Sequence, residues 1–241
     1  MIISRFISDL PFVHKINAGP ATGLQFEVML PRDKAIWKGT YEHEFASDIA
    51  RSITRGDVCY DVGGYRGYIS GVMALAGATK VVVFEPLPAN LHAIKRLQNL
   101  NPQFGIELLP FALGNVRGSM RFKVLPDPSM GKVFTSSFQS DVASVYEIEV
   151  AMRRLDDLVT QGVIPKPNVI KIDVEGAELE VLKGANDVLM ERRPLIFLEA
   201  HSNALEQACR RELQRLGYEV RRSGAAPSED QDARHLICTP L

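Results

Sequence analysis

Short apolar runs alternate with segments of helical length along the chain from residue 56 onwards. Four of these runs end in a turn, and they span residues 57–62 (DVCYDV), 80–86 (KVVVFEP), 167–176 (PNVIKIDVEG) and 193–201 (RPLIFLEAH). Continuous apolar strands of this kind are typical of a parallel sheet that is covered on both faces. The alternation therefore predicts an α/β fold with a mostly parallel sheet and helices on both faces.

The end of the chain predicts one exception to the parallel arrangement. Residues 218–222 (YEVRR) and 233–240 (ARHLICTP) have the pattern of strands, and the turn-rich segment between them is too short for a helical crossover. The last strand is therefore expected to be antiparallel.

The other predicted elements complete a single domain over residues 1–241. Residues 23–30 alternate apolar and polar positions, which predicts a half-buried strand. Further expected elements are a strand at 106–113, a segment at 118–125 that extends the sheet, a strand and short helix at 145–162, and one helix at 177–193. We expect residues 1–55 to form a short N-terminal β/helical extension or lid, and residues 56–241 to form the core.

The charge balance of the chain argues against two classes of partner. The 28 Lys and Arg residues nearly match the 29 Asp and Glu residues, which gives a formal net charge of −1. Such a chain has no general attraction to nucleic acids or anionic membranes. No run approaches the ~18 apolar residues of a membrane span, and the three cysteines lack metal-ligand spacing. We therefore expect a soluble cytoplasmic protein.

A glycine-rich turn, Asp61-Val62-Gly63-Gly64-Tyr65-Arg66-Gly67, follows the first core strand. In an open α/β sheet, ligands bind at the carboxyl ends of the strands. Gly63 and Gly67 allow the backbone to approach a ligand closely, and the helix that follows directs free amide groups at a carboxylate. Asp61 can accept a hydrogen bond from an ammonium group, so the turn suits an amino-acid ligand better than a pyrophosphate.

An acid at the end of the second core strand indicates an adenosine. Glu85 lies 18 residues after Gly67, where a carboxylate can bind both ribose hydroxyls. The turn lacks the G-x-G-x-x-G spacing of nicotinamide-binding proteins. Together the turn and Glu85 predict an S-adenosylmethionine site.

These motifs resemble the FkbM family of methyltransferases. The resemblance covers about residues 40–201 and rests on DVGGYRGY, VVVFEPLPAN, FALGNVRG, RRLDDL, IKIDVEGAELEVLKGA and LIFLEAH, of which IKIDVEGAE is the most specific. It implies a class I (Rossmann-like) methyltransferase fold, S-adenosylmethionine as methyl donor, and mostly hydroxyl acceptors on sugars or secondary metabolites. The chain departs from the family at Asn115, where an acid is frequent.

The resemblance also implies roles for individual residues. Asp61, Gly63 and Gly67 match the cofactor loop, Glu85 the ribose-binding acid and Ala112 the adenine side, while Tyr41 and Glu42 resemble an N-terminal lid. The predicted cofactor-binding residues are Glu42, Asp61, Gly63, Gly64, Tyr65, Gly67, Glu85, Pro86, Ala112 and Asp173.

Four polar side chains at two strand ends are the candidate catalytic residues. Asp173 and Glu175 are two positions apart after the fourth core strand, and Glu199 and His201 repeat this spacing after the fifth. His201 is the best candidate for a general base, because the ordinary histidine pKa of ~6.5 suits proton transfer near neutral pH. Helix capping would explain either acid at the fourth strand. The four side chains could instead hold magnesium, although no metal ligands are assigned.

Several functions remain open at this point. The leading hypothesis is an S-adenosylmethionine-dependent O-methyltransferase that acts on a hydroxyl of a sugar or natural product, with Ser136 and Ser137 in the loop that forms the acceptor wall. An acid-lined site also suits N-methylation of an amine or a protein side chain. A non-catalytic nucleotide- or cofactor-binding protein is the third alternative. The N-terminal β segment could pair with another copy in a homodimer.

Overall fold

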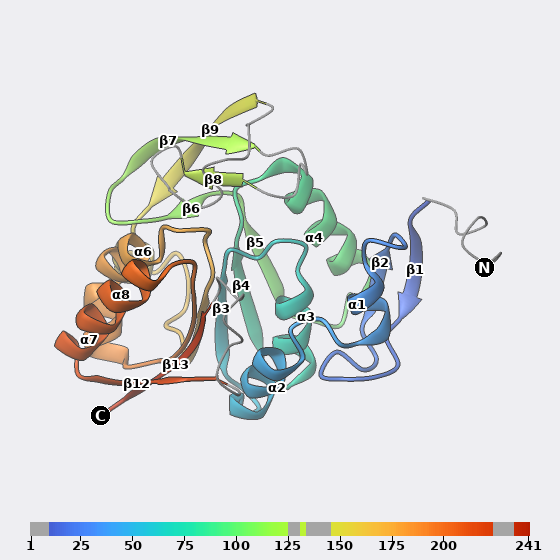
Figure 1. The fold of residues 1–241 in the computed structure, drawn as a ribbon, viewed down its shortest axis with the longest axis horizontal. Coiled ribbons are helices and arrows are strands. Elements are labelled where there is room, and N and C mark those ends of the chain that lie inside the picture. The colour runs from blue at the N-terminus through green and yellow to red at the C-terminus, as the bar shows by residue number, and fades with distance from the viewer. Residues whose placement is uncertain (1–9, 125–130, 134–145, 224–233) are drawn as a thin grey trace.

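A seven-stranded sheet forms the centre of the molecule. The computed structural model describes residues 10–124, 131–133, 146–223 and 234–241 (Figure 1). In spatial order the strands are β12 (Tyr218–Arg222), β13 (Arg234–Pro240), β11 (Leu195–Ala200), β10 (Val169–Ile172), β3 (Val58–Val62), β4 (Lys80–Phe84) and β5 (Ile106–Leu109). From β11 to β5 all neighbours are parallel, whereas β13 is antiparallel to both β11 and β12. The predicted parallel sheet and its antiparallel last strand are confirmed.

Helices cover both faces of this sheet because its central strands are apolar on both sides. In β4, Val81 and Val83 pack in one core with Val72 and Ile94, and Val82 and Phe84 pack in the other core. The first face carries α2 (His43–Ser52), α3 (Tyr68–Leu75) and α4 (Pro88–Leu100). The second carries α5 (Leu155–Thr160), α6 (Glu178–Gly184), α7 (Asn186–Arg192) and α8 (Asn203–Arg215).

A second, four-stranded sheet lies beyond the carboxyl ends of the central strands, at the top of Figure 1. Its order is β6 (Ala112–Leu113), β9 (Tyr146–Arg153), β7 (Gly118–Val124) and β8 (Gly131–Val133). The prediction that residues 118–125 extend the main sheet is therefore wrong. The physical reason is visible in β7, where Phe122 and Val124 are buried and the intervening residues are more exposed. A strand with one buried face does not fit inside a doubly covered sheet.

Two further predictions are corrected at element boundaries. The single strand expected at 106–113 is interrupted at Pro110, so β5 belongs to the main sheet and β6 to the second sheet. The single helix expected at 177–193 is divided at Ala185 into α6 and α7. Gly184 ends α6, and a Cβ there would lie 2.0 Å from the carbonyl oxygen of Gly114. The helix breaks where its backbone must pass this close to another segment.

The N-terminal extension packs against the glycine-rich turn. It contains the hairpin β1 (Phe12–Lys15) and β2 (Gln25–Val28) and the short helix α1 (Lys34–Lys38). Arg66 of the turn is buried; its Nη1 lies 2.8 Å from Asp33 Oδ1, and its Nη2 donates a hydrogen bond to the carbonyl oxygen of Glu27. This contact connects the extension to the site. Among the described residues, no helix is both long and apolar enough to span a membrane.

Candidate active site

The strands β3 and β10 are neighbours, but the chain continues from β3 to β4 on one side and reaches β10 only later. This reversal is the topological switch point, where open α/β sheets bind ligands at the carboxyl ends of the strands. The predicted site residues follow β3, β4, β10 and β11 at this edge. The topology therefore brings these separated motifs together.

Gly63 shows why the turn after β3 needs glycine. Its φ is +81°, and a Cβ at this position would lie 1.7 Å from the carbonyl oxygen of Asp173. Its amide donates a hydrogen bond to the carbonyl oxygen of Phe84. The turn is thus pressed between the ends of β10 and β4, and only a residue without a side chain fits.

Glu85 is held in place by backbone amides. It directly follows β4 and is 4% exposed. Its Oε2 accepts a hydrogen bond from the amide of Tyr65 at 2.9 Å, and its Oε1 accepts one from the amide of Leu87 at 2.8 Å. Burial raises the pKa of Glu85 to about 7, although these hydrogen bonds favour the ionised form. The carboxylate is fixed and has further acceptor capacity.

A cavity of about 370 Å³ lies beside Glu85. This volume is in the range of small-molecule and cofactor sites. Apolar side chains such as Phe84, Leu113 and Met152 form much of its wall. The sequence-predicted residues that line it are Gly63, Tyr65, Glu85, Pro86, Ala112, Asp173 and Glu175.

Four predicted cofactor residues do not belong to the lining of this cavity, namely Glu42, Asp61, Gly64 and Gly67. Asp61 is fully buried; Ser70 Oγ donates a hydrogen bond to its Oδ2 at 2.5 Å. Its Oδ1 lies 3.2 Å from Lys171 Nζ. The Asp61 carboxylate thus already faces Ser70 and Lys171, and its contact with a ligand ammonium stays a prediction.

Lys171 is the residue that the sequence analysis missed. Its side chain is 3% exposed; Nζ lies 3.1 Å from Asp173 Oδ2 and donates a hydrogen bond to the carbonyl oxygen of Gly63 at 2.6 Å. Burial lowers the pKa of Lys171, but the carboxylates of Asp173 and Asp61 outweigh it and raise this pKa. A lysine inside the apolar run VIKI was the available signal, because a buried lysine requires partners.

Four carboxylates surround His201 at the ends of β10 and β11. Its Nδ1 lies 2.8 Å from Glu178 Oε1. Its Nε2 lies 3.5 Å from Asp173 Oδ1, 3.4 Å from Glu175 Oε2 and 3.8 Å from Glu199 Oε1. The structure thus brings all four candidate catalytic residues together, and it adds Glu178 of α6.

These contacts change the expected protonation of His201 and Glu175. Burial lowers the pKa of His201, but the hydrogen bond to Glu178 and the neighbouring carboxylates raise it to about 9. Burial raises the pKa of Glu175 to about 8. The expectation of an ordinary His201 pKa does not hold, because near neutral pH most of this imidazole is protonated and cannot accept a proton. Glu175 has the lower of the two raised pKa values, so a larger fraction of it is ionised and able to accept a proton near neutral pH.

Glu42 reaches the same edge from the N-terminal extension. It precedes α2 with φ 44° and ψ 39°, a conformation that is uncommon for a residue with a side chain. Burial raises its pKa to about 7, and the charges of Asp173 and Glu199 add to this effect.

His235, which the sequence analysis did not single out, also lies at this edge. It is opposite Glu199 in the β11–β13 pair, with its Nε2 3.1 Å from Glu199 Oε2. The register of the antiparallel strand β13 places His235 beside Glu199, and no local sequence motif predicts that register. Ser136 and Ser137, the predicted acceptor wall, lie outside the described residues.

The comparisons with known proteins agree with this architecture. The Methyltransferase FkbM domain model matches residues 61–220. A curated relative, hexuronic acid methyltransferase AglP of Haloferax volcanii, is 32% identical over 61% of this chain and 56% of its own. Methyltransferase 1 of Beauveria bassiana is 27% identical over 54% of this chain and 64% of its own. The chain thus spans somewhat over half the length of these relatives.

A solved structure shares the fold. The crystal structure of methyltransferase FkbM from Methylobacillus flagellatus KT superimposes with a TM-score of 0.54 at 19% identity, over 76% of this chain and 43% of the other. At this level of identity the match concerns the arrangement of the sheet and helices.

Proposed function

Because the chain belongs to the FkbM methyltransferase family, we propose that it transfers the methyl group of S-adenosylmethionine to a hydroxyl group of a sugar. The observation that carries the proposal is the cavity next to Glu85, which is also lined by the carboxylates of Asp173 and Glu175. One end of this cavity suits an adenosyl group, and the other suits the acceptor and its proton. The hexuronic acid activity of the Haloferax volcanii relative supports a sugar as acceptor.

The residues of the cavity fit the cofactor. The buried Glu85 would accept hydrogen bonds from ribose hydroxyls, and Ala112, Met152 and Phe84 would provide apolar surface for adenine. Gly63 lines the cavity, and because it has no Cβ its backbone can lie against the carbonyl oxygen of Asp173, which lines the cavity too. Asp173 and Tyr41 line the cavity and suit the polar methionine part. When bound, S-adenosylmethionine supplies a methyl group on a positively charged sulfur.

The acceptor side of the edge orients the hydroxyl and removes its proton. The broken carbon–sulfur bond would leave its electron pair on the sulfur of S-adenosylmethionine, so the residues of this chain need only orient the acceptor oxygen and take its proton. Glu175 takes the hydroxyl proton, with a pKa near the working pH. His201 keeps Asp173, Glu175 and Glu199 at one point through its contacts with all three. Orientation of this kind contributes much of the rate in a displacement.

The acid-rich acceptor side also favours a second candidate, methylation of an amine, because carboxylates bind a protonated amine well. One experiment separates the two. The protein is incubated with S-adenosylmethionine labelled with ¹³C at the methyl carbon and either a methyl glucuronoside, a methyl glucoside or a lysine peptide. NMR of the product then distinguishes an O-methyl from an N-methyl group.

The proposal predicts an O-methylated sugar, with no product in a Glu85→Ala control. An N-methylated peptide as the only product would support the amine alternative. Binding of S-adenosylhomocysteine without transfer to any acceptor of either class would favour a non-catalytic cofactor-binding protein.

A further inference from the structure

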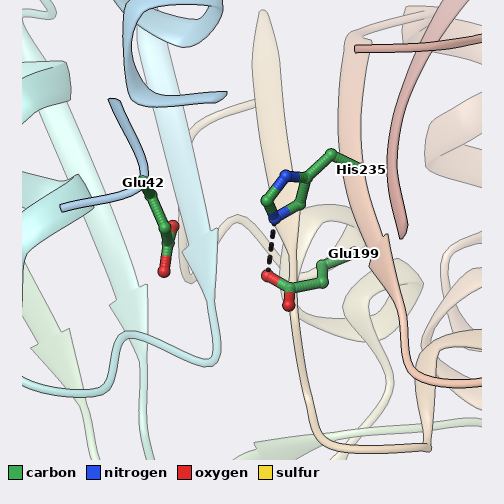
Figure 2. A group of neighbouring side chains, drawn as sticks. All are labelled: Glu42, Glu199 and His235. Carbon is green, nitrogen blue, oxygen red and sulfur yellow. Dashed lines mark hydrogen bonds and ion pairs between the residues drawn. The ribbon is translucent and has the colours of Figure 1, made fainter. Parts of the chain in front are cut away.

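A second cluster of polar side chains lies beside the His201 group, on the side away from Glu85. It consists of Glu42 at the start of α2, Glu199 in β11 and His235 in β13 (Figure 2). We propose that Glu42, Glu199 and His235 form a binding site for a divalent transition-metal ion such as Mn²⁺ or Zn²⁺. This site goes beyond the methyl transfer proposed above and does not depend on the identity of the acceptor.

The ligand atoms are close enough to share one ion. One carboxylate oxygen each from Glu42 and Glu199 and one ring nitrogen of His235 all lie within 4.8 Å of one another. Zinc ligands lie about 2.0–2.2 Å from the metal, so two ligands of one ion are separated by up to roughly 4.3 Å. The observed separation of up to 4.8 Å exceeds this limit by about 0.5 Å, which is within the reach of side-chain rotation.

Glu42 provides an independent indication that a ligand is missing. Within the described part of the chain, its Oε2 is shielded from solvent and has no hydrogen-bond partner. A shielded carboxylate oxygen without a partner costs folding free energy. The charges of Asp173 and Glu199 add to this cost, because they also face Glu42. A cation between Glu42 and Glu199 satisfies the orphaned oxygen and removes the repulsion.

The imidazole of His235 is oriented before any ion arrives. Its ring stacks on Phe45 with centroids 4.0 Å apart and an angle of 9° between the planes. Phe45 in turn packs edge-to-face on Phe197. The stack directs Nε2 of His235 toward Glu199 (Figure 2). Support of this kind around a metal ligand raises affinity, because the ligand loses little freedom on binding.

The donor set selects the class of ion. Two carboxylates and one imidazole suit Mn²⁺ or Zn²⁺, whereas Mg²⁺ and Ca²⁺ prefer oxygen ligands alone. Asp173, Glu199 and His201 of the magnesium set considered from sequence also lie within 4.8 Å of one another. His201 is a less suitable ligand than His235, because its Nδ1 is held 2.8 Å from Glu178 and its Nε2 is shared among three carboxylates. Three protein ligands at the second cluster leave further coordination positions open for water or an acceptor oxygen.

The test is a titration of the full chain with Mn²⁺, followed by electron paramagnetic resonance of the free ion. The proposal predicts about one bound Mn²⁺ per chain with micromolar affinity, displacement by Zn²⁺, and much weaker binding of Mg²⁺. Glu199→Gln and His235→Gln should each weaken Mn²⁺ binding by tenfold or more. The matched control is His43→Gln, because His43 is exposed and adjacent to Glu42 in sequence.

Each contrary outcome is informative. Absence of Mn²⁺ binding by the unaltered protein overturns the proposal, whether or not the variants fold. Equal Mn²⁺ binding by His235→Gln, Glu199→Gln and His43→Gln also overturns it, since the ion then lies elsewhere. Circular dichroism of both variants establishes that a loss of binding is not a loss of fold. No step of this test requires a methyl donor or acceptor, so its failure leaves the proposed methyl transfer intact.

Discussion

The two halves of the sheet edge treat their carboxylates differently. On the side of β3 and β4, Glu85 accepts hydrogen bonds from two backbone amides, and Asp61 is enclosed by Lys171 and Ser70. On the side of β10, β11 and β13, several carboxylates surround His201, and Glu42 retains a shielded oxygen without a partner in the described residues. In the first half each of these two carboxylates has hydrogen-bond donors or a lysine beside it, whereas the second half gathers more carboxylates around fewer positively charged groups.

This difference suggests a division of labour. A rigid, satisfied half suits recognition of an invariant cofactor, because little rearrangement accompanies binding. A half with crowded carboxylates and raised pKa values suits proton transfer and a positively charged partner. Variants in the two halves should therefore separate cofactor affinity from methyl transfer.

Lys171 lies between the halves, and its removal should have the largest effect. Lys171→Met leaves Asp61 and Asp173 without their shared cation, and loss of one partner of a buried ion pair costs about 3–5 kcal/mol in free energy of unfolding. Urea denaturation followed by circular dichroism measures this loss. The control is Lys183→Met, whose exposed pair with Glu180 should contribute less than about 1 kcal/mol. Equal losses of unfolding free energy in the two variants would show that Lys171 does not stabilise the buried carboxylates of Asp61 and Asp173.

Substitution of His201 tests the half of the edge at β10, β11 and β13, which we propose binds the acceptor (the acceptor half). In His201→Gln the amide can still hydrogen-bond to Glu178, but the positive charge among the carboxylates is lost. We expect methyl transfer to fall by about 100-fold or more, the usual scale for disrupted proton transfer. Calorimetry should show an unchanged affinity for S-adenosylhomocysteine. A matching loss of this affinity would contradict the separation of the halves.

Substitution of Glu85 tests the half of the edge at β3 and β4, which we propose binds the cofactor (the cofactor half). Glu85→Ala removes two hydrogen bonds to a charged acceptor, each contributing about 1.5 kcal/mol or more, so affinity for S-adenosylhomocysteine should fall by ~100-fold. Isothermal titration calorimetry measures the change. Glu219→Ala, on the exposed part of β12, is the matched control and should bind normally. Near-normal binding by Glu85→Ala would place the ribose elsewhere.

The raised pKa of Glu85 predicts a pH dependence. Only the ionised carboxylate can accept from two hydroxyls, so affinity for S-adenosylhomocysteine should fall by up to about tenfold per pH unit below about 7. In Glu85→Gln the affinity for S-adenosylhomocysteine should be lower at every pH, and its dependence on pH should disappear. A slope that persists in this variant would assign the titration to another group.

The same pKa gives a stability prediction with the opposite sign. The pKa of Glu85 in the folded chain exceeds its ordinary value of 4.5. The carboxyl group therefore stays protonated to a higher pH in the folded chain than in the unfolded chain. The contribution of Glu85 to the free energy of unfolding therefore falls as pH rises from 4.5 to about 7. Urea unfolding across this range should show a slope that Glu85→Gln reduces.

The sequence predicted the cofactor half better than the acceptor half. The glycine turn and Glu85 follow consecutive strands, so a local motif and the strand–helix alternation suffice to place them together. His235 reaches Glu199 only through the register of an antiparallel strand. Glu42 was predicted as a lid residue at the cofactor, but its approach to Glu199 follows from the packing of the N-terminal extension. Such contacts depend on tertiary packing, which single-sequence patterns do not specify.

Protonation was also beyond the reach of the sequence. His201 has an ordinary pKa as an isolated residue, yet the carboxylates from β10, β11 and α6 raise it to about 9. Lys171 was recognisable only as a lysine in an apolar run, and its link between Asp61 and Asp173 required the paired strands. The residue types were predictable, but the charges they carry follow from their neighbours.

A crystal structure of the complex with S-adenosylhomocysteine tests the division of the edge most directly. We expect both ribose hydroxyls to donate hydrogen bonds to Glu85, adenine to lie against Ala112, and the sulfur to face Asp173 and Glu175. A ribose away from Glu85, or a homocysteine group seated between Glu199 and His235, would contradict it.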